Sequence, residues 1–464
     1  MIGRRWWIAM ALLLPAGCNV GPNYKRPPVT VPDSYRGLAP NLPPQTAASF
    51  ADEKWWTVFQ DPQLQTLIHT ALAQNYDVRI AAARVLQAQA QLGITRADQF
   101  PAIYGGAGTA NLRNPETKIS NAFDTSANQV NLSLSWELDF WGKYRRATEA
   151  ARANLLATEW GQKAVIWSLV SNVASAYFQL LELDAEMEIS QRALDARKRS
   201  LHLVQLRETG GATSMLDVRQ SEQLVYTAAE NIPALQKSIE QQENLISILL
   251  GENPEPIKRD VTLTETHFPP TVPAGLPSSL LERRPDLQQA EQQMIAANAQ
   301  IGVAKAAYFP DISLTAVAGY QSSALTSLFS GPAGLWSFGG QLTQPIFTAG
   351  LLRSNVRLAE AQEQEAVLFY QQSIQQAFRE VSDSLIAYRK DQEYREQQQL
   401  LTASAQDTVR LANLRYTGGV TSYLEVLDSD TRYFNADIAL AQAELAERLD
   451  LIQLYNALGG GWQQ

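Results

Sequence analysis

The sequence predicts a mainly α-helical protein that also contains membrane-spanning β-strands and is built from an internal two-fold repeat. Three observations predict this fold class. The motif RETGGATSMLDV at 207–218 recurs as RYTGGVTSYLEV at 415–426, the stretch 143–208 contains no proline, and residues 130–140 alternate strictly between apolar and polar side chains. A repeat this long is typical of a supersecondary unit duplicated within one polypeptide.

The repeat extends well beyond the shared motif. Arg207 and Arg415 lie 208 positions apart, and Gly142 and Gly350 share that offset. Phe100-Pro101 recurs as Phe309-Pro310 at an offset of 209. We therefore expect four segments, which are a lipoprotein signal peptide at 1–17, an acylated N-terminal tether at 18–61, a first repeat at 62–270 and a second repeat at 271–464.

Composition limits the class of protein. The 464 residues include 38 basic and 47 acidic side chains, for a net charge of −9, and no long basic run is present, so nucleic acid is excluded as a partner. Past the N-terminus there is no run of 18 apolar residues, and the mean hydropathy is −0.21. These values exclude a helical membrane protein, so any insertion into a bilayer must use strands.

The N-terminus is typical of an export signal. Arg4 and Arg5 precede a short apolar core, and the sequence Leu14-Pro15-Ala16-Gly17-Cys18 ends it with small residues. Cys18 is the only cysteine, so no intrachain disulfide is possible, and its position predicts a lipid-attachment site. The alternative is an ordinary export signal with an incidental cysteine.

Short helices and a stop follow the extended tether. A helix is expected from Pro62 to about Asn75, and a second is expected to be capped by Asp77 and to run to Asp98. Phe100-Pro101 is expected to end the second of these helices.

The next region predicts a membrane-spanning hairpin. A weak strand at 103–112 and a polar loop at 113–127 precede a run whose apolar residues alternate with polar ones. Strict alternation puts the apolar set on one face, and 11 residues suit a tilted transmembrane strand, so we expect this face to contact lipid. A strand of a soluble sandwich is the alternative. The lipid-facing set is Val130, Leu132, Leu134, Trp136, Leu138 and Phe140.

The second copy predicts the same elements. A helix from Asp286 to about Tyr308 is followed by a strand at 312–320 and a returning strand marked by Trp336, Phe338, Leu342 and Ile346. Each chain then has four strands, and four strands leave an open edge whose unpaired backbone is costly in hydrocarbon. Three chains would supply about twelve strands and leave room for a lumen, so we expect a homotrimer.

The longest helix of each unit follows its hairpin. In the first copy it covers 143–208, about 100 Å at the α-helical rise, and its apolar residues form a coiled-coil seam. The Thr-Gly-Gly motif ends it, and Thr213 or Ser214 can cap a return helix to about Leu250. The seam consists of Leu169, Val173, Ala176, Leu180, Leu183, Met187, Leu194 and Leu201.

With these elements in place, the whole mature chain resembles the TolC-like outer-membrane efflux family, specifically its lipoprotein branch. The segment CNVGPNYKRP at 18–27 is similar to the opening of that branch, and RYTGGVTSYLEVLDSD at 415–430 resembles the helix-turn signature. The resemblance implies a trimeric twelve-stranded β-barrel in the bacterial outer membrane, continuous with an α-helical coiled-coil barrel in the periplasm. It also implies an exit duct for small molecules or drugs that works with a periplasmic adaptor and, through it, an inner-membrane transporter.

By position, the resemblance places the two Thr-Gly-Gly turns at the periplasmic tip, where adaptor hairpins would dock into shallow helical grooves. The alternative is that the glycines only end helices. The docking residues are Gly210, Gly211, Thr213, Ser214, Gly418, Gly419, Thr421 and Ser422.

The resemblance also implies a periplasmic gate lined by acids. Glu425 and Asp428 are three residues apart on one helix face, so three chains would gather six carboxylates whose repulsion needs cations or donors to offset it. Asp217 aligns with Glu425, and Tyr416 is expected to hydrogen-bond across helices. The alternative is a solvated helix face.

No pattern of catalytic, metal-binding or cofactor-binding residues is found in the sequence. The three histidines are scattered, and no GxSxG motif or phosphate-binding glycine loop occurs, so we expect no enzyme, no metal site and no cofactor. Two rival functions remain, a duct for protein secretion and a periplasm-spanning lipoprotein scaffold that does not conduct.

Overall fold

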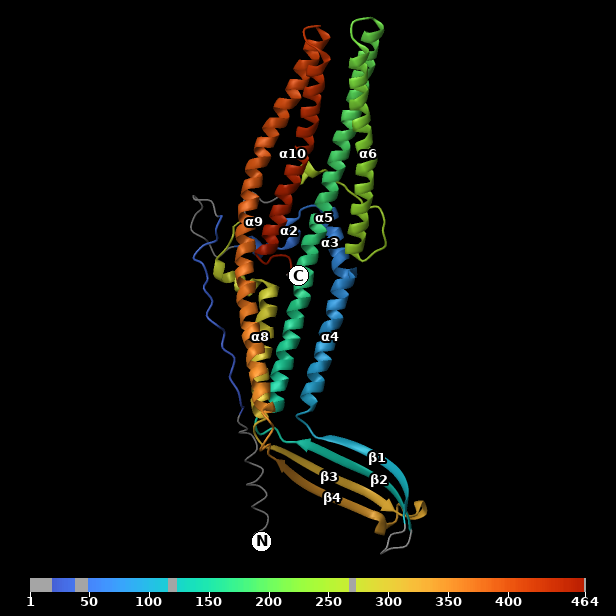
Figure 1. Ribbon diagram of the computed structural model, residues 1–464, viewed down its shortest axis with the longest axis vertical. Helices are drawn as coiled ribbons and strands as arrows, with labels where there is room; N and C mark the ends of the chain where they lie inside the picture. Colours follow the sequence, from blue (N-terminus) through green and yellow to red (C-terminus); the bar gives the residue numbers. More distant parts are fainter. Residues whose placement is uncertain (1–18, 38–48, 116–122, 267–272, 463–464) are drawn as a thin grey trace. The chain divides into compact units, whose positions relative to one another are not determined.

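The computed structural model describes residues 19–37, 49–115, 123–266 and 273–462, so the signal peptide and Cys18 lie outside the described residues. Figure 1 traces the course of the chain and labels its helices and strands. The chain divides into two compact units. The first, called here the sheet unit, comprises Met1–Pro28, Arg84–Glu159 and Gln289–Gln371. The second, the hairpin unit, comprises Val29–Ala83, Trp160–Gln288 and Gln372–Gln464.

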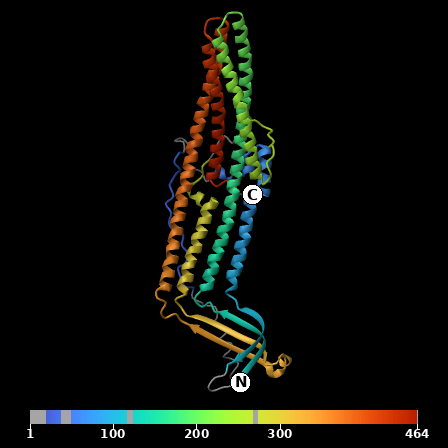
Figure 2. The same ribbon diagram turned by 45° about the vertical axis from the view of Figure 1, so that its right-hand side comes forward.

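Two pairs of long helices dominate the chain, one pair from each repeat (Figure 2). The longest helices, α5 and α9, have 67 residues each, and the glycine turns end both as predicted. The bounds are α5 Lys143–Thr209, α6 Met215–Leu250, α9 Leu351–Thr417 and α10 Tyr423–Ala457. The other α-helices are α2 Trp55–Val58, α3 Pro62–Gln74, α4 Tyr76–Ala97, α7 Leu280–Arg283 and α8 Pro285–Ala306.

The cap of α4 differs from the prediction. The Asn75 side-chain oxygen accepts hydrogen bonds from the backbone N–H groups of Asp77 at 2.8 Å and Val78 at 3.2 Å. Because the helix begins at Tyr76, one residue earlier than expected, the preceding Asn75 takes the capping position and Asp77 lies in the first turn. The Asn75 amide also donates to the Leu249 carbonyl at the end of α6.

The seam of α5 is fully buried only in its first half. Leu169, Val173, Ala176 and Leu180 are buried, whereas Leu183, Met187, Leu194 and Leu201 are half-buried, and Leu201 packs against a buried cluster that includes Val204. The buried positions there are instead Ser190, Arg197 and Val204, spaced seven apart. One 18-residue window of α5 is apolar enough to cross a membrane, but 56% of it is buried inside the protein, as in a core helix.

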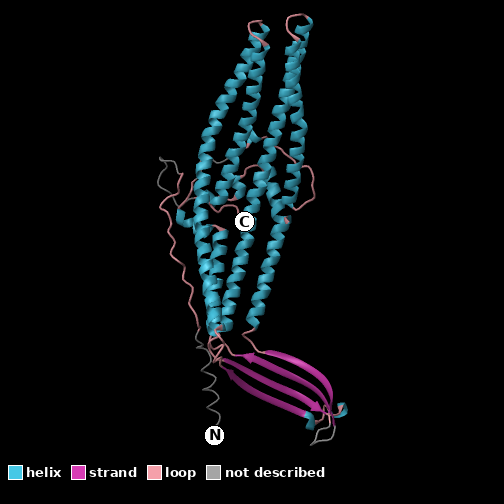
Figure 3. Ribbon diagram, viewed as in Figure 1, coloured by secondary structure: helices cyan, strands magenta, loops and turns pink. Residues whose placement is uncertain are grey.

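The four strands form one antiparallel sheet in the order β1-β2-β3-β4, one hairpin from each repeat (Figure 3). Their bounds are β1 Ala102–Asn114, β2 Phe123–Glu137, β3 Asp311–Ser322 and β4 Gly334–Thr343. The predicted number of strands per chain is therefore confirmed.

Cross-strand register gives the sheet one apolar face. Leu134 lies opposite Ile103 on β1 and Ala316 on β3, and Ala316 lies opposite Phe338 on β4. The next row on the same face joins Gly105, Leu132, Ala318 and Trp336. The other face carries mostly polar side chains such as Ser133, Asn131, Thr315 and Ser337, as expected for a strand between lipid and water.

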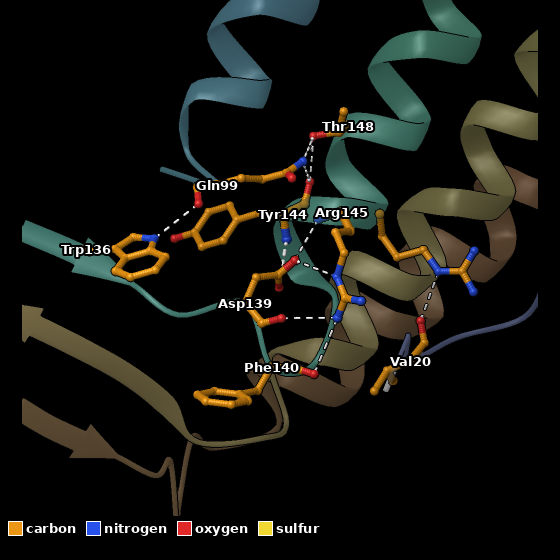
Figure 4. A network of polar contacts seen from close by, with 9 residues as sticks. Val20, Gln99, Trp136, Asp139, Phe140, Tyr144, Arg145 and Thr148 are labelled. Carbon is orange, nitrogen blue, oxygen red and sulfur yellow. Dashed lines mark hydrogen bonds and ion pairs between the residues drawn. The ribbon is translucent and has the colours of Figure 1, made fainter. Parts of the chain in front are cut away.

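The bounds of β2 differ from the prediction. The strand begins at Phe123, within the expected loop, and ends at Glu137, so Leu138 and Phe140 lie beyond it. The chain leaves the sheet because the Asp139 carboxylate accepts hydrogen bonds from the backbone N–H groups of Tyr144 and Arg145, at 3.2 and 2.9 Å, and so caps α5 (Figure 4). Ile346 similarly lies past the end of β4.

Residues 19–26, called here the strap, pack against the helices of the sheet unit. The guanidinium of Arg146, 2% exposed, donates from Nε to the Val20 carbonyl at 3.2 Å and from Nη2 to the Gly21 carbonyl at 3.3 Å and Asn23 Oδ1 at 2.8 Å. Gly21 has a φ of +100°, and a Cβ there would lie 2.5 Å from the Gly302 Cα. Only glycine fits this approach.

Candidate gate and docking turns

The two turns of the hairpin unit make the same backbone hydrogen bonds. After α5, the N–H of Ala212 donates to the Arg207 carbonyl at 2.8 Å. After α9, the N–H of Val420 donates to the Arg415 carbonyl at 2.9 Å. The residue before each donor, Gly211 or Gly419, has a φ of +72° or +74°. Both turns are therefore Schellman motifs, in which the second glycine is required by its left-handed backbone.

Each turn passes into a helix through a hydroxyl and an acid. The Thr213 hydroxyl donates to the Asp217 carboxylate, and the Thr421 hydroxyl donates to the Glu425 carboxylate. The Ser214 backbone N–H also donates to Asp217, at 3.3 Å. Thr213 and Thr421 are thus occupied in local bonds.

The two predicted gate acids each have a cation within their own chain. Glu425 Oε1 lies 2.9 Å from Arg415 Nη1, and Asp428 Oδ2 lies 2.8 Å from Arg432 Nε. The Asp428 and Arg432 side chains are 59% and 75% exposed, so solvent screens that pair, while the Glu425 carboxylate is 35% exposed. Each of the two acids is therefore paired with an arginine of its own chain.

The first repeat uses its arginine differently. Arg207, at the position equivalent to Arg415, has its Cζ 4.6 Å from the centre of the Tyr416 ring. Within the described residues Asp217 forms no ion pair. The repeat thus gives one turn an ion pair and the other a cation–π contact between the two hairpins.

The predicted hydrogen bond of Tyr416 across helices is wrong. In the part of the chain that the structure describes, its buried hydroxyl has no hydrogen-bond partner. Its ring instead packs against that of Tyr423, with centroids 5.3 Å apart, in a buried cluster that also contains Val204, Val218, Ala412 and Val426.

Tyr423 makes the hydrogen bond across the hairpins. This buried residue begins α10, and its hydroxyl donates to Ser221 Oγ on α6 at 3.1 Å and lies 3.2 Å from Ser200 Oγ on α5. Sequence analysis did not select Tyr423, because Met215 occupies the equivalent place in the first repeat and the partners are remote in sequence.

A buried ion pair also joins the hairpins. Arg197 on α5 is 4% exposed, and its Nε lies 2.8 Å from Asp430 Oδ2 on α10. Its Nη1 donates to the Leu224 carbonyl on α6 at 3.3 Å, and its guanidinium lies over the Phe434 ring. Arg197 lies seven residues from both Ser190 and Val204, and this heptad spacing is the sequence pattern from which its burial could have been predicted.

Exposed apolar side chains surround both turns. Leu206, Met215 and Leu216 flank the first, and Leu414, Val420 and Leu424 flank the second, each more than half exposed. We call these six residues the tip patch. Such residues around a paired-helix end are typical of a protein contact surface.

The predicted site residues thus fall into separate regions. The gate and turn residues share the hairpin unit, whereas the predicted lipid-facing residues belong to the sheet unit, and Cys18 is not described. Among the described residues no group of three or more His, Cys, Asp or Glu is arranged to hold a metal.

Comparison with known proteins identifies a family. Residues 67–252 and 276–460 match the sequence profile of the family described as outer membrane efflux protein. The chain is 37% identical over 460 residues to the cation efflux system protein CusC of Escherichia coli O6:H1, covering 98% of both chains. It is 36% identical over 462 residues to the probable efflux pump outer membrane protein TtgC of Pseudomonas putida, covering 98% of this chain and 95% of that one.

A solved structure shows the same fold. The open state of the MtrE outer membrane channel of Neisseria gonorrhoeae superposes with a TM-score of 0.86 at 31% identity, covering 96% of this chain and 99% of that one.

Proposed function

The chain belongs to the outer membrane efflux protein family and is an outer-membrane efflux channel, and from that premise we propose that it forms the exit duct of a tripartite pump for small molecules. The predicted fold, a trimeric channel with four strands per chain and long periplasmic helices, is confirmed. Relatives are named for cation and toluene efflux. By analogy, the cargo of this duct is a small molecule, and the chain performs no catalytic step.

The ion pairs at the second turn carry the proposal of a gate. Glu425 and Arg415 join the start of α10 to the end of α9, so the acid is held to its own hairpin while the duct is closed. In the trimer, three copies each of Glu425 and Asp428 then line the narrow end of the duct. Their paired arginines reduce the repulsion among these six carboxylates. Opening requires α9 and α10 to move away from α5 and α6, against the bonds of Tyr423 and Arg197.

A cell-based assay tests the gate. In cells that depend on this duct, a Glu425→Ala/Asp428→Ala variant should admit a large antibiotic such as vancomycin, which outer membranes exclude. An Asp407→Asn variant is the matched control, since Asp407 is an exposed acid of α9 that forms an ion pair with Arg410. Equal sensitivity of the double variant and the control would refute a gate at these acids.

We place adaptor docking at the tip patch and the two glycine turns. The backbone of each turn is fixed by its Schellman bonds, and the patch offers apolar surface on both hairpins. A helical hairpin of the adaptor would fit its apolar face into such a groove.

Charge substitution in the tip patch tests docking. Leu216→Glu/Leu424→Glu should abolish copurification of the cognate adaptor and efflux in cells, while the purified channel stays trimeric. Leu400→Glu, at an exposed position on α9 that is remote in sequence from the turn, is the control. Normal adaptor capture by the double variant would place docking elsewhere.

The remaining proposal is lipid attachment at Cys18, supported by its place after the apolar signal core and directly before the strap. Labelling cells with radioactive palmitate should mark the wild-type protein and leave a Cys18→Ser variant unlabelled. Label in both proteins would refute this site.

A further inference from the structure

The sheet unit leaves apolar side chains exposed at both edges of its sheet. Ile346 and Phe347, which follow β4, are 90% and 87% exposed, the highest values among the large apolar residues of the described chain. At the same end of the sheet, Phe100, Ile103 and Tyr104 at the start of β1 are 58%, 65% and 65% exposed. Because β1 and β4 are the outer strands, these two sets indicate a surface that one chain leaves incomplete.

The junction between the two repeats shows how such a surface is covered. Here β2 of the first repeat pairs with β3 of the second. The backbone N–H of Leu138, just past β2, donates to the Ile312 carbonyl on β3 at 2.8 Å, and both residues are half-buried. Beside them the Trp141 ring stacks on the Phe309 ring, with centroids 4.8 Å apart. Within the chain, this junction covers the apolar side chains of both strands.

The exposed residues occupy the equivalent positions of the repeat. The offset of 208 that applies after the hairpins relates Leu138 to Ile346, and the offset of 209 that applies before them relates Ile312 to Ile103. Among the described residues Ile346 forms no backbone hydrogen bond, so its N–H can make the bond that Leu138 makes. The acceptor must come from another chain, since β4 has no neighbour on its outer edge.

We propose that the junction between protomers of the trimer copies the junction between the two repeats, with β4 paired to β1 of the partner subunit in the same register. The Ile346 N–H then donates to the carbonyl of the partner's Ile103, and the two side chains lie on one face of the joined sheet. Ala349 stands at the position equivalent to Trp141, so the ring that meets the partner's Phe100 comes instead from Phe347. This contact depends on the trimer and not on the gate or on adaptor docking.

Cysteine cross-linking of the purified full-length trimer tests the register. Ile346→Cys/Ile103→Cys places the cysteines directly opposite each other across the junction, within the Cα separation that a disulfide requires. After oxidation, non-reducing electrophoresis should show most of the protein as covalently linked trimers. In the matched control, Gln344→Cys/Ile103→Cys, the cysteines are displaced by two residues, so at least about tenfold less protein should be linked. Single-cysteine variants control for links through Cys18.

A substitution tests the apolar contact separately. Phe347→Asp should lower the yield of trimer at least about fivefold, because its carboxylate would be buried against the partner's Phe100. Leu325→Asp is the control and should leave the yield unchanged, since Leu325 is an exposed residue of the loop between β3 and β4.

Size-exclusion chromatography confirms that the cysteine variants remain trimeric. Trimers that link in neither cysteine pair, that link equally in both, or that link only in the control pair would overturn the register. A normal trimer yield in Phe347→Asp would overturn the contact of Phe347 and assign this side chain to lipid.

Discussion

Replacing Arg146 with methionine is expected to release the strap from the sheet unit. The guanidinium is almost completely buried and donates to three acceptors of the strap, the carbonyl groups of Val20 and Gly21 and the side chain of Asn23. Methionine retains much of the apolar stem and removes every donor.

The magnitude follows from those acceptors. Val20 and Gly21 are half-buried and Asn23 is exposed, so water replaces part of the lost bonding. A hydrogen bond to a charged donor contributes about 1.5–3 kcal/mol, and the losses are not additive because the three acceptors share one donor. We therefore expect the docked strap to lose about 2–3 kcal/mol. The contacts of Tyr24 and Arg26 with Glu291 would remain.

Hydrogen exchange of the strap amides measures this change. Protection of residues 19–23, including the Val20 N–H that donates to the Trp141 carbonyl, should fall by about one to two orders of magnitude in Arg146→Met. Arg152→Met is the control, since Arg152 is an exposed arginine of the same helix. Unchanged protection in Arg146→Met would refute the reasoning and show that the Glu291 contacts suffice.

Three further predictions concern the stability of the trimer. Arg197→Met should destabilise the hairpin unit by about 1.5–3 kcal/mol in denaturant melts, because the half-buried Asp430 loses its charged hydrogen-bond donor; adding Asp430→Asn should restore part of the loss, and no restoration would contradict the pairing. Leu134→Arg should cost about 2–4 kcal/mol on a lipid face and lower the trimer yield, whereas a normal yield would argue against that face. Burial, a hydrogen bond that protonated Glu182 donates to Glu186, and the negative charge of Glu186 raise the pKa of Glu182 to about 8, so the folded state binds the extra proton and stability should fall as pH rises from about 4 to 8. Glu182→Gln should flatten that fall in the melting temperature, and an unchanged slope would contradict it.

Local sequence signals predicted the turns and the long helices well. The glycine pairs end α5 and α9 within one residue of the expected position, because a Schellman turn depends only on its own backbone. The number of strands and the alternation of apolar and polar residues along them could also be predicted, since successive side chains of a strand point to opposite faces of the sheet.

Element ends were less predictable, because competing local bonds decide them. Leu138 and Phe140 continue the apolar alternation of β2, but the Asp139 carboxylate binds the first N–H groups of α5 and the chain leaves the sheet. Residues 123–129 are mainly polar and carry no alternation, so their place in β2 depends on pairing with β1 and β3.

Contacts between distant segments could not be predicted from one sequence. The partner of Tyr423 is Ser221, 202 positions away, and Arg197 finds Asp430 at a separation of 233. The contacts of the strap could not be predicted either. Residues 19–26 show no helical or strand periodicity, yet Gly21 packs on Gly302 and Arg146 donates hydrogen bonds to the segment.

Conductance in a planar lipid bilayer tests the central claim most directly. The purified trimer should show a small conductance if Glu425 and Asp428 form the proposed gate, and Glu425→Ala/Asp428→Ala should raise it clearly. Conductance that is equal in both proteins would contradict a gate at these acids. Absence of conductance in both would contradict a conducting duct opened at these residues and would favour a scaffold.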